Sequence, residues 1–389
     1  MAHRYLILNL LLLVTFATAS SAQRLPVKRI KLPPGFGISV VTNDTPGARS
    51  LARSADGTLF VGTRREGVVY AVEDSDGDHR ADRVSVIVRD LHLPNGVAVR
   101  DKDLYVAEIG RIIRYRDIDR WKTDTPSPEV IFDRLPAEEH HGWRYIAFGP
   151  DGMLYVSIGA PCNVCLRDDD PRFGSISRLQ TDGSNFEIFA RGIRNSVGFD
   201  WNPATDVLWF TDNGRDWLGD DRPPDELNRA PHAGMHFGFP FCHGGDISDP
   251  KFGAKTSCDE FVGPAIELGP HVAALGMKFY QGTMFPRTFR NRIFIAEHGS
   301  WNRTVPIGYR LSTVSLDGNN NAYNYETFAS GWRTQADGTE GAPWGRPVDL
   351  LELPDGSLLV ADDLAGAIYR VSFSANGEQQ ITPTATQQK

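Results

Sequence analysis

Six similar strand pairs follow one another along this chain, and they constrain its fold more than any other feature. In each pair, an alternating apolar strand entered through Asp-Gly or a similar turn is followed by a polar link and a second strand. The first strands are Gly57–Thr63, Asp103–Glu108, Gly152–Ile158, Asp206–Thr211, Asn291–Ala296 and Gly356–Ala361. Their partners are Gly67–Ala71, Arg111–Tyr115, Ser175–Leu179, Glu226–Arg229, Tyr309–Thr313 and Ala367–Val371. Strand-rich repeats about 45 to 85 residues apart, with little helical pattern, indicate radial repetition rather than a sandwich.

The repeats predict an all-β, six-bladed β-propeller that forms a single domain over residues 23–373. We expect the early strand Gly37–Thr42 to pair with the C-terminal blade, because this pairing closes the ring and removes open strand edges. A solenoid fits less well, since the repeats vary widely in length. The longest interruption, Pro231 to Pro286, is expected to build an insertion over one face, where ligands commonly bind.

The two ends of the chain differ in composition from the repeats. Residues 1–22 combine Arg4, an apolar run from Tyr5 to Phe16 and small residues at Ser20–Ala22, which is typical of a secretory signal peptide. That run is too short to span a bilayer as a stable helix, and no later stretch is long enough. We therefore expect a periplasmic or secreted protein without a membrane span. The polar residues 374–389 are expected to form a disordered tail.

Export would place the four cysteines in an oxidising compartment, where disulfides are the default. Pairing in sequence order gives Cys162 with Cys165, and Cys242 with Cys258 inside the insertion. A redox or zinc site is the alternative for these cysteines. A c-type haem is excluded at the first pair because Leu166, not histidine, follows Cys165.

Basic and aromatic side chains gather where strands begin or end, which is where active sites tend to lie in β-structures. His140 and His141 precede a strand of the third repeat, and a neutral imidazole is a natural acceptor for the proton of a sugar hydroxyl. A hydrogen-bonded structural role is the alternative. Arg194 and Asn195 lie between glycines and suit a planar anion, although such a pair can also stabilise a turn. Arg346 enters the sixth blade and could direct another guanidinium inward.

Two acidic segments are candidates for binding Ca²⁺. Asp74, Asp76 and Asp78 alternate around a glycine, with Asp82 further on, and hard oxygen ligands on a tight loop are what Ca²⁺ requires. A solvated acidic turn explains this loop equally well. In the second segment, residues 211–228, clustered carboxylates and glycine-exposed carbonyls favour a cation over a loop capped by Asx turns.

Several function classes lack support in the sequence. No Gly-rich dinucleotide fingerprint, P-loop or Gly-x-Ser-x-Gly elbow is present, which argues against nicotinamide, nucleotide and serine-hydrolase chemistry. The formal net charge is -8, and no block of lysine or arginine offsets it, so we expect no nucleic-acid partner.

Taken together, several segments resemble the soluble dehydrogenases that use pyrroloquinoline quinone (PQQ) to oxidise sugars, and most closely their glucose/sorbosone branch. The resemblance covers nearly the whole mature chain. It rests on His140-His-Gly-Trp-Arg144 with Phe-Gly-Pro-Asp-Gly152, on Gly192-Ile-Arg-Asn195, on Asp225-Glu-Leu-Asn228 leading to Gly238-Phe-Pro240, and on Leu275-Gly-Met-Lys-Phe-Tyr280. It implies a six-bladed propeller that holds PQQ at the channel mouth, with Ca²⁺ between cofactor and protein.

The resemblance implies a role for each matching residue. His140 is similar to the general base that takes the proton of the anomeric hydroxyl while hydride passes to the quinone, and His141 is its rival for that role. Arg194 is similar to the residue that polarises the quinone carbonyl. Asn195 and Arg346 are similar to contacts of the cofactor.

The resemblance also implies a metal site. The backbone carbonyls of Gly214 and Arg215 fall where members of the family bind Ca²⁺, and Asp225 falls where an acid lies close to the cofactor. A tricarboxylate quinone needs guanidinium and Ca²⁺ charge around it, so the chemistry agrees with these positions.

Three positions depart from the family pattern. Ala160 stands where glucose-oxidising members have the acid that orients the base, and Val348 where a second cofactor arginine is expected. His271 takes the place of a small hydroxyl residue of the cofactor site. Arg303 or Lys278 could supply the missing positive charge.

We therefore predict an exported, PQQ- and Ca²⁺-dependent dehydrogenase that oxidises an aldose or a related, sorbosone-like sugar. An external acceptor, a quinone or a cytochrome, would reoxidise the reduced cofactor. One alternative is a calcium-dependent propeller lactonase, which would have little use for both Arg194 and Arg346. The other is a non-catalytic sugar- or protein-binding propeller, in which His140 is structural.

Overall fold

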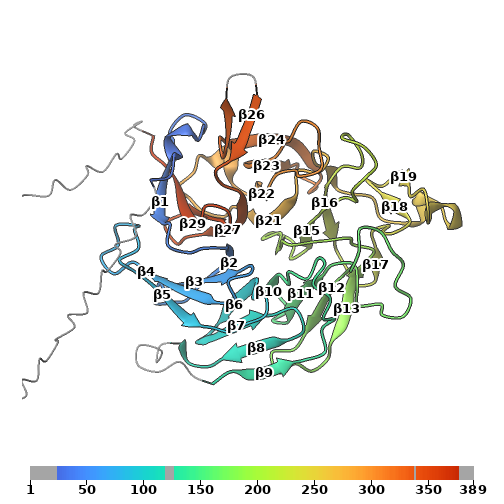
Figure 1. The fold of residues 1–389 in the computed structure, drawn as a ribbon, viewed down its shortest axis with the longest axis horizontal. Helices are drawn as coiled ribbons and strands as arrows, with labels where there is room; N and C mark the ends of the chain where they lie inside the picture. Colours follow the sequence, from blue (N-terminus) through green and yellow to red (C-terminus); the bar gives the residue numbers. More distant parts are fainter. Residues whose placement is uncertain (1–23, 119–126, 337–338, 376–389) are drawn as a thin grey trace, which may run out of the picture.

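Short alternating strands fold into four-stranded antiparallel sheets that radiate from a central axis, as Figure 1 shows. The computed structural model describes residues 24–118, 127–336 and 339–375. The expected signal peptide and all but the first residues of the expected tail lie outside these ranges. Within them six sheets of four or five strands form the blades, beside two two-stranded hairpins, which confirms the all-β, six-bladed β-propeller. None of the helices in these ranges is long and apolar enough to cross a bilayer.

Each blade is numbered from the N-terminus and its strands are given in chain order. Blade 1 contains β2 (Ala48–Arg53), β3 (Leu59–Thr63), β4 (Val69–Glu73) and β5 (Arg83–Val88). Blade 2 contains β6 (Gly96–Arg100), β7 (Asp103–Ala107), β8 (Ile112–Tyr115) and β9 (Glu129–Phe132). Blade 3 contains β10 (Ile146–Phe148), β11 (Leu154–Ile158), β12 (Ser175–Leu179), β13 (Glu187–Arg191) and a short parallel addition, β17 (Met235–His236).

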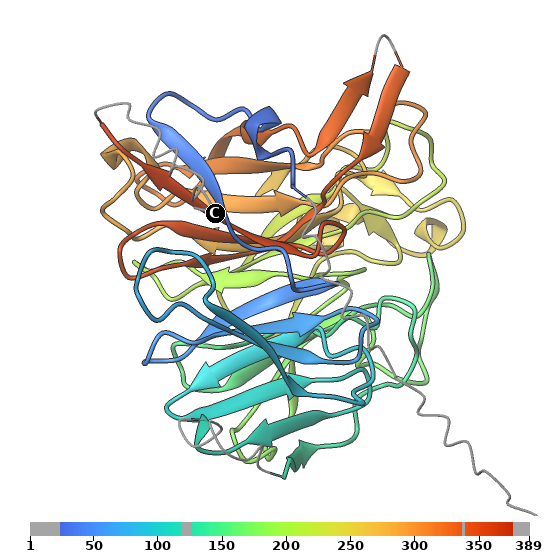
Figure 2. The same ribbon diagram turned by 60° about the vertical axis from the view of Figure 1, so that its left-hand side comes forward.

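The remaining blades follow the same order. Blade 4 contains β14 (Phe199–Trp201), β15 (Leu208–Asp212), β16 (Glu226–Ala230) and β20 (Ile266–Glu267). Blade 5 contains β21 (Ala274–Phe279), β22 (Ile293–Glu297), β23 (Arg310–Leu316) and β24 (Ala322–Ser330). Blade 6 contains β27 (Pro347–Glu352), β28 (Leu358–Asp362), β29 (Ala367–Phe373) and β1 (Phe36–Thr42). A hairpin of β25 (Arg333–Ala336) and β26 (Thr339–Pro343) projects from the ring, as Figure 2 shows.

The six strands that open each sequence repeat are the second strands of the blades, not the innermost ones. Every residue of β3, β11, β15, β22 and β28 is buried, because neighbouring blades cover both faces of these strands. They therefore give the strongest apolar signal. The innermost strands of blades 3 and 4, β10 and β14, have only three residues each, too few to produce a recognisable period.

The ring closes through β1, which pairs antiparallel with β29 and sets Phe36 opposite Phe373. This confirms the closure expected for the early strand. The Phe36 ring packs edge-on against Phe285 and Phe328, with ring centroids 4.8 and 5.0 Å away. The first described strand thus belongs to the aromatic core between blades 5 and 6.

The disulfide-tied insertion leaves blade 4 after β16 and returns at β20, so it is shorter than the expected Pro231 to Pro286. The end of that range belongs to the propeller, because β21 is the innermost strand of blade 5. The insertion contains a small hairpin, β18 (Cys242–His243) with β19 (Ile247–Ser248), at the rim of the ring in Figure 1. The Cys242–Cys258 and Cys162–Cys165 disulfides both form, as expected. Short 3-10 helices complete the structure: η1 (Val27–Arg29), η3 (Gly253–Lys255), η4 (Cys258–Glu260) and η5 (Arg287–Phe289).

Candidate active site

A cavity of about 460 Å³ opens at one end of the propeller axis. Innermost strands begin at this end and second strands finish there, because the two run antiparallel in every blade. Their loops therefore converge on the same space. The lining residues are Arg49, Arg64, Arg65, Leu93, Glu139, His140, His141, Trp143, Arg194, Asn195, Val197, Asn213, Gly214, Asp216, Asp225, His271, Ala273, Leu275, His298, Trp301, Asn302 and Arg346.

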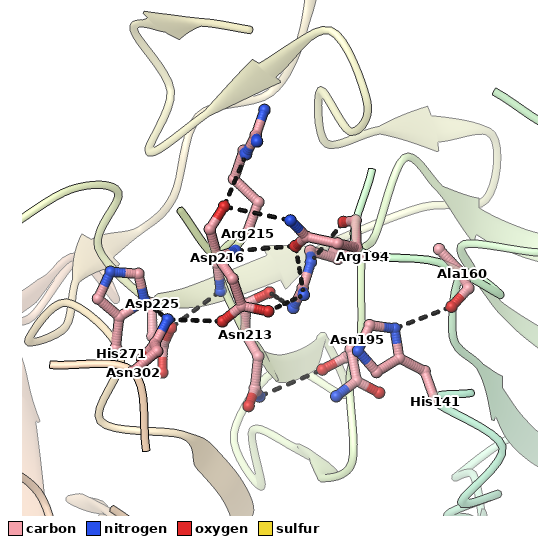
Figure 3. Close-up of polar contacts among 12 residues, drawn as sticks. His141, Ala160, Arg194, Asn195, Asn213, Arg215, Asp216, Asp225, His271 and Asn302 are labelled. Carbon is pink, nitrogen blue, oxygen red and sulfur yellow. Dashed lines mark hydrogen bonds and ion pairs between the residues drawn. The ribbon is translucent and has the colours of Figure 1, made fainter. Parts of the chain in front are cut away.

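His141 and His140 lie side by side before β10, but only His141 is oriented by a hydrogen bond. The Nδ1 atom of His141 lies 2.8 Å from the Ala160 carbonyl oxygen (Figure 3). A carbonyl can only accept, so Nδ1 carries the hydrogen and Nε2 keeps a free lone pair. Burial and the positive charge of Arg194 hold the pKa of His141 well below its usual value. Its imidazole is therefore neutral and can accept a proton at Nε2.

The His140 ring is exposed, and its centroid lies 4.1 Å from that of His141. Partial desolvation and Arg194 lower the pKa of His140 as well. Among the described residues, no side chain or carbonyl accepts a hydrogen bond from this ring. Nothing in the described part of the chain therefore fixes its tautomer.

Arg194 is almost fully buried and is clamped by the short disulfide loop of blade 3. Its Nε donates to the Asn163 carbonyl at 2.9 Å and its Nη2 to the Asn163 Oδ1 at 3.0 Å. Nη2 also pairs with Asp216 Oδ2 at 3.1 Å, and Nη1 donates to the Asn213 carbonyl at 3.1 Å. In the described contacts, four of the five guanidinium hydrogens are thus engaged and one on Nη1 is left for a ligand.

A group of buried carboxyls holds the backbone beneath Arg194. Asp212 accepts from the amides of Arg194 and Asn195 at 2.8 and 2.6 Å. Asp225 accepts from the amide of Gly214 at 2.9 Å, and burial raises the pKa of Asp225 to about 7. Burial and the charge of Glu226 raise the pKa of Asp212 too. These carboxyls fix the loops that carry Arg194 and Gly214.

Asp216 also links the cavity to blade 5. Its Oδ1 accepts from Asn302 Nδ2 at 2.6 Å, and the same amide nitrogen lies 3.4 Å from His271 Nδ1 (Figure 3). His271 Nε2 lies 3.0 and 3.1 Å from the carbonyls of Gly219 and Arg222, so Nε2 carries the hydrogen and Nδ1 accepts. His271 therefore lines the cavity but its two ring nitrogens are already used by the protein.

A cationic wall of Arg49, Arg64 and Arg346, which the sequence only partly predicted, faces the cavity from blades 1 and 6. Arg49 Nη1 lies 3.1 Å and Arg64 Nη1 3.6 Å from Asp363 Oδ2. His298 Nε2 lies 2.8 Å from the other oxygen of Asp363. Arg346 donates instead to backbone carbonyls, those of His298 at 2.9 Å and Gly299 at 2.6 Å.

This wall has excess positive charge. The His298 and arginine contacts lower the pKa of Asp363, so it is ionised, yet it is the one carboxylate paired with these guanidiniums in the described residues. The Arg64 guanidinium also stacks on an aromatic ring, because its Cζ atom lies 4.9 Å from the centroid of the Trp143 ring. A polyanion bound here would meet guanidinium groups that the protein already partly shields from water. Its binding would therefore desolvate little additional charge on the protein.

The residues present fit a planar, multiply charged quinone and a hard cation. The cavity volume falls within the range of small-molecule sites. Buried Oδ1 atoms of Asn195 and Asn302 have no hydrogen-bond partner in the described structure, and amide oxygens are ligands that Ca²⁺ accepts. Buried unpaired acceptors are costly, and a ligand or ion that met these two oxygens would remove that cost.

Comparison with known proteins agrees with this chemistry. A family model described as glucose/sorbosone dehydrogenase matches residues 107–300, and one described as TrAA12-like matches residues 246–374. An uncharacterized protein of Borreliella burgdorferi is 33% identical over 357 residues, covering 88% of this chain and 91% of its own. The chain belongs to the glucose/sorbosone dehydrogenase family.

Two relatives named as sugar dehydrogenases match over shorter parts. Aldose sugar dehydrogenase YliI of Escherichia coli is 27% identical over 187 residues, 43% of this chain and 48% of that protein. A PQQ-dependent pyranose dehydrogenase of Coprinopsis cinerea is 30% identical over 247 residues, 56% of this chain and 32% of that protein. The family thus includes PQQ-dependent sugar dehydrogenases.

Solved structures share the fold at low sequence identity. The calcium structure of a Trichoderma reesei enzyme of family AA12 has a TM-score of 0.78 at 19% identity, covering 91% of this chain and all of that one. The holo PQQ domain of the C. cinerea pyranose dehydrogenase has a TM-score of 0.73 at 18% identity, covering 88% of this chain and 97% of that one.

Most residues predicted from the family resemblance meet in the cavity, and a few do not. His140, Arg194, Asn195, Gly214, Asp225, His271 and Arg346 line it. The Arg215 side chain points away, in Figure 3, and pairs with Asp249 of the insertion at 2.5 Å. Arg303 donates to Asp221 Oδ1 at 3.1 Å and to the Asp220 carbonyl, and Lys278 pairs with Asp200 at 2.9 Å. Neither cation lines the cavity, and Val348 is packed against Val197 and Leu275.

The predicted acidic calcium loop lies far from this cavity. Ligand atoms of Asp74, Asp76 and Asp78 come within 4.8 Å of one another, and all three residues are exposed. Asp82 Oδ2 instead accepts from the amide of Ser75 at 2.7 Å. The loop follows β4, which runs antiparallel to β3, whose end leads to Arg64. It therefore lies at the opposite end of blade 1.

Proposed function

We propose that this protein is a PQQ- and Ca²⁺-dependent dehydrogenase that oxidises an aldose or a related, sorbosone-like sugar. The observation that carries the proposal is the arrangement in one cavity of a guanidinium wall opposite a histidine whose Nε2 is free. The wall suits a polyanionic quinone, and the imidazole suits a sugar hydroxyl. Bound PQQ would supply the acceptor for the hydride that leaves the sugar carbon.

We assign cofactor binding to Arg49, Arg64 and Arg346, together with Asn195. These guanidiniums are preorganised by Asp363 and by backbone carbonyls, so they need no large rearrangement to meet carboxylates. Arg194 keeps one Nη1 hydrogen for an oxygen that gains negative charge during the reaction. Its other hydrogens fix its direction, so this donor is already aimed before substrate binds.

We assign the base to His141 rather than His140. The Ala160 carbonyl keeps the hydrogen of His141 on Nδ1, and the lowered pKa keeps the ring neutral. The Ala160 backbone carbonyl thereby orients the His141 ring, as the carboxylate of an acid at position 160 would. Alanine at this position is therefore compatible with catalysis. His141 Nε2 would take the proton of the anomeric hydroxyl.

For calcium we propose the loop at Gly214 and Arg215, whose carbonyls would act together with Asn195 Oδ1. Asp225 holds this loop by accepting from the Gly214 amide. Ca²⁺ prefers such neutral and anionic oxygens. The Asp74, Asp76 and Asp78 loop is proposed as a separate, structural Ca²⁺ site on the other face, with Asp82 supporting it through Ser75.

The proposal extends to the location and the redox partner. A cleaved signal peptide at residues 1–22 would deliver the enzyme to the periplasm or the medium, where the two disulfides are stable. An external quinone or cytochrome would then reoxidise the cofactor.

The test is titration of the purified, metal-free protein with PQQ, with and without Ca²⁺, followed by cofactor absorbance and by dye reduction with a panel of aldoses and sorbosone. We expect calcium-dependent binding and sugar-dependent dye reduction. Arg346→Ala should weaken PQQ binding, whereas Arg292→Ala, an arginine outside the cavity that pairs with Glu326, should leave it unchanged. Hydrolysis of lactones with Ca²⁺ alone, or sugar binding that His141→Gln leaves unaltered without any turnover, would refute the proposal.

A further inference from the structure

Two tryptophans at the rim of the cavity are left largely exposed. Trp217 is 68% and Trp301 is 64% accessible, and their rings meet edge to face with centroids 5.5 Å apart. Trp301 lines the central cavity, whereas Trp217 lines an adjoining open groove of about 490 Å³. The pair therefore stands between two hollows, which are lined by neighbouring residues of one loop, Asp216 and Trp217.

The loops that carry the two rings are fastened to each other. Asn302, next to Trp301, donates to Asp216, next to Trp217, at 2.6 Å. The Thr304 amide donates to Asp220 Oδ2 at 3.0 Å, and Arg303 bonds to Asp221 from the same loop. Arg303 thus joins the two loops that hold the aromatic pair. The rings project from a preorganised support instead of from mobile segments.

Exposing two indoles side by side is unfavourable in water, and such surfaces commonly bind ligands. A pyranose ring has apolar faces and a polar edge, so it can stack on an indole while its hydroxyls meet polar groups. The groove beside Trp217 supplies those groups in Arg215 and Lys251.

We propose that Trp217 and Trp301 form a subsite for the second sugar residue of a neutral oligosaccharide whose reducing-end residue reacts in the central cavity. The inference rests on the proposed function and narrows its substrate to reducing oligosaccharides. The groove beyond Trp217 would hold the following residue of the chain. The contact between the two rings would let one ligand run from one hollow to the other.

The first experiment compares kcat/KM for a monosaccharide and for the matching di- and trisaccharide, using dye as acceptor. In Trp217→Ala we expect the KM for the longer sugars to rise about tenfold, equivalent to about 1.4 kcal/mol. The monosaccharide constants should stay within twofold, because Trp217 does not line the central cavity. Trp217→Phe should restore most of the loss. Tyr323→Ala, which removes an aromatic ring 52% exposed on β24, is the matched control.

The second experiment does not need turnover: tryptophan fluorescence of the purified full chain is titrated with reduced oligosaccharides, which lack an anomeric hydroxyl. Quenching that Trp217→Ala removes would support the subsite even if no sugar is oxidised, in which case only the dehydrogenase proposal fails. Equal constants for Trp217→Ala and wild type on every sugar would overturn the subsite. The subsite would also be overturned if Trp217→Ala lowered activity only with a redox protein as acceptor and did so for sugars of every length, because that result assigns the rim to protein docking.

Discussion

Asn163 lies between the cysteines of the Cys162–Cys165 disulfide, and its side chain connects Arg194 with Asp216, which flank the reaction site. Asn163 Oδ1 accepts from Arg194 Nη2 at 3.0 Å and from the Asp216 amide at 2.8 Å. Asn163 Nδ2 donates to the Asp216 carbonyl at 3.2 Å. Asn163→Ala removes these three bonds, but it keeps the bond from Arg194 Nε to the backbone carbonyl of residue 163.

The expected magnitude follows from these contacts. A hydrogen bond to a charged group contributes about 1.5 to 3 kcal/mol, and a neutral one about 1 kcal/mol. Because Asn163 is half-buried and water can replace part of the loss, we expect the free energy of unfolding to fall by about 2 kcal/mol. With one of its four contacts gone and its partner Asp216 held less firmly, the Arg194 guanidinium can turn. We expect kcat to fall about tenfold to a hundredfold, less than complete loss of an oxyanion donor would cause.

The assay is urea unfolding together with steady-state dye reduction at saturating PQQ with a monosaccharide. Val164→Ala, the adjacent position in the same disulfide loop, is the control, since its side chain faces the groove and makes no bond to Arg194. Asn163→Asp keeps both acceptor contacts, so it should recover most of kcat. The reasoning would be refuted by a kcat of Asn163→Ala equal to that of Val164→Ala. A rise in KM with unchanged kcat would also refute it, because Asn163 would then contact the sugar.

Three further outcomes are expected. His141→Gln should lower kcat by about 10²- to 10⁴-fold while His140→Gln costs less than tenfold, and the reverse order in dye reduction would return the base to His140. Asp225 binds its proton more tightly in the native state, where its pKa is about 7. The unfolding free energy of the metal-free protein should therefore fall between pH 4 and pH 7. In urea titrations, Asp225→Asn should make the unfolding free energy depend less on pH over this range. Replacing Cys242 and Cys258 by serine opens a bridge between residues 16 apart and should cost roughly 3 kcal/mol of unfolding free energy, an expectation that unchanged urea midpoints would contradict.

The fold could be predicted from the sequence because one strand of each blade is covered on both faces. Burial on two faces selects a run of at least three apolar residues at the start of each of β11, β15 and β28, and these strands repeat at visible intervals. The start of each blade could not be predicted in the same way. β10 and β14 are too short to show a period, and their position depends on the neighbouring blades.

The site could be predicted from the sequence where its residues are neighbours along the chain. It could not be predicted where residues from distant parts of the chain come together only because the ring of blades closes. Arg194 and Asn195 stand together before β14, so their pattern is visible locally. Arg49 and Asp363 are separated by 314 positions, and no local motif marks either as part of the cavity. Arg303 shows the opposite failure, because the sequence places it near the cavity but cannot give the direction of its side chain.

The pairing of β1 with β29 makes the timing of folding depend on the far end of the chain. Phe36 contacts a partner at Phe373, and closing so long a loop costs more entropy than pairing neighbouring strands within a blade. During synthesis, β1 therefore waits until the last blade has been made, with its hydrogen-bonding edge uncovered. A chain that stops before Ala367 lacks β29, so it leaves the edges of β1 and β28 open and is prone to aggregate. The pairing of β1 with β29 thus distinguishes a full-length chain from a truncated one, since only a chain that contains both strands can cover the hydrogen-bonding edges of β1 and β29.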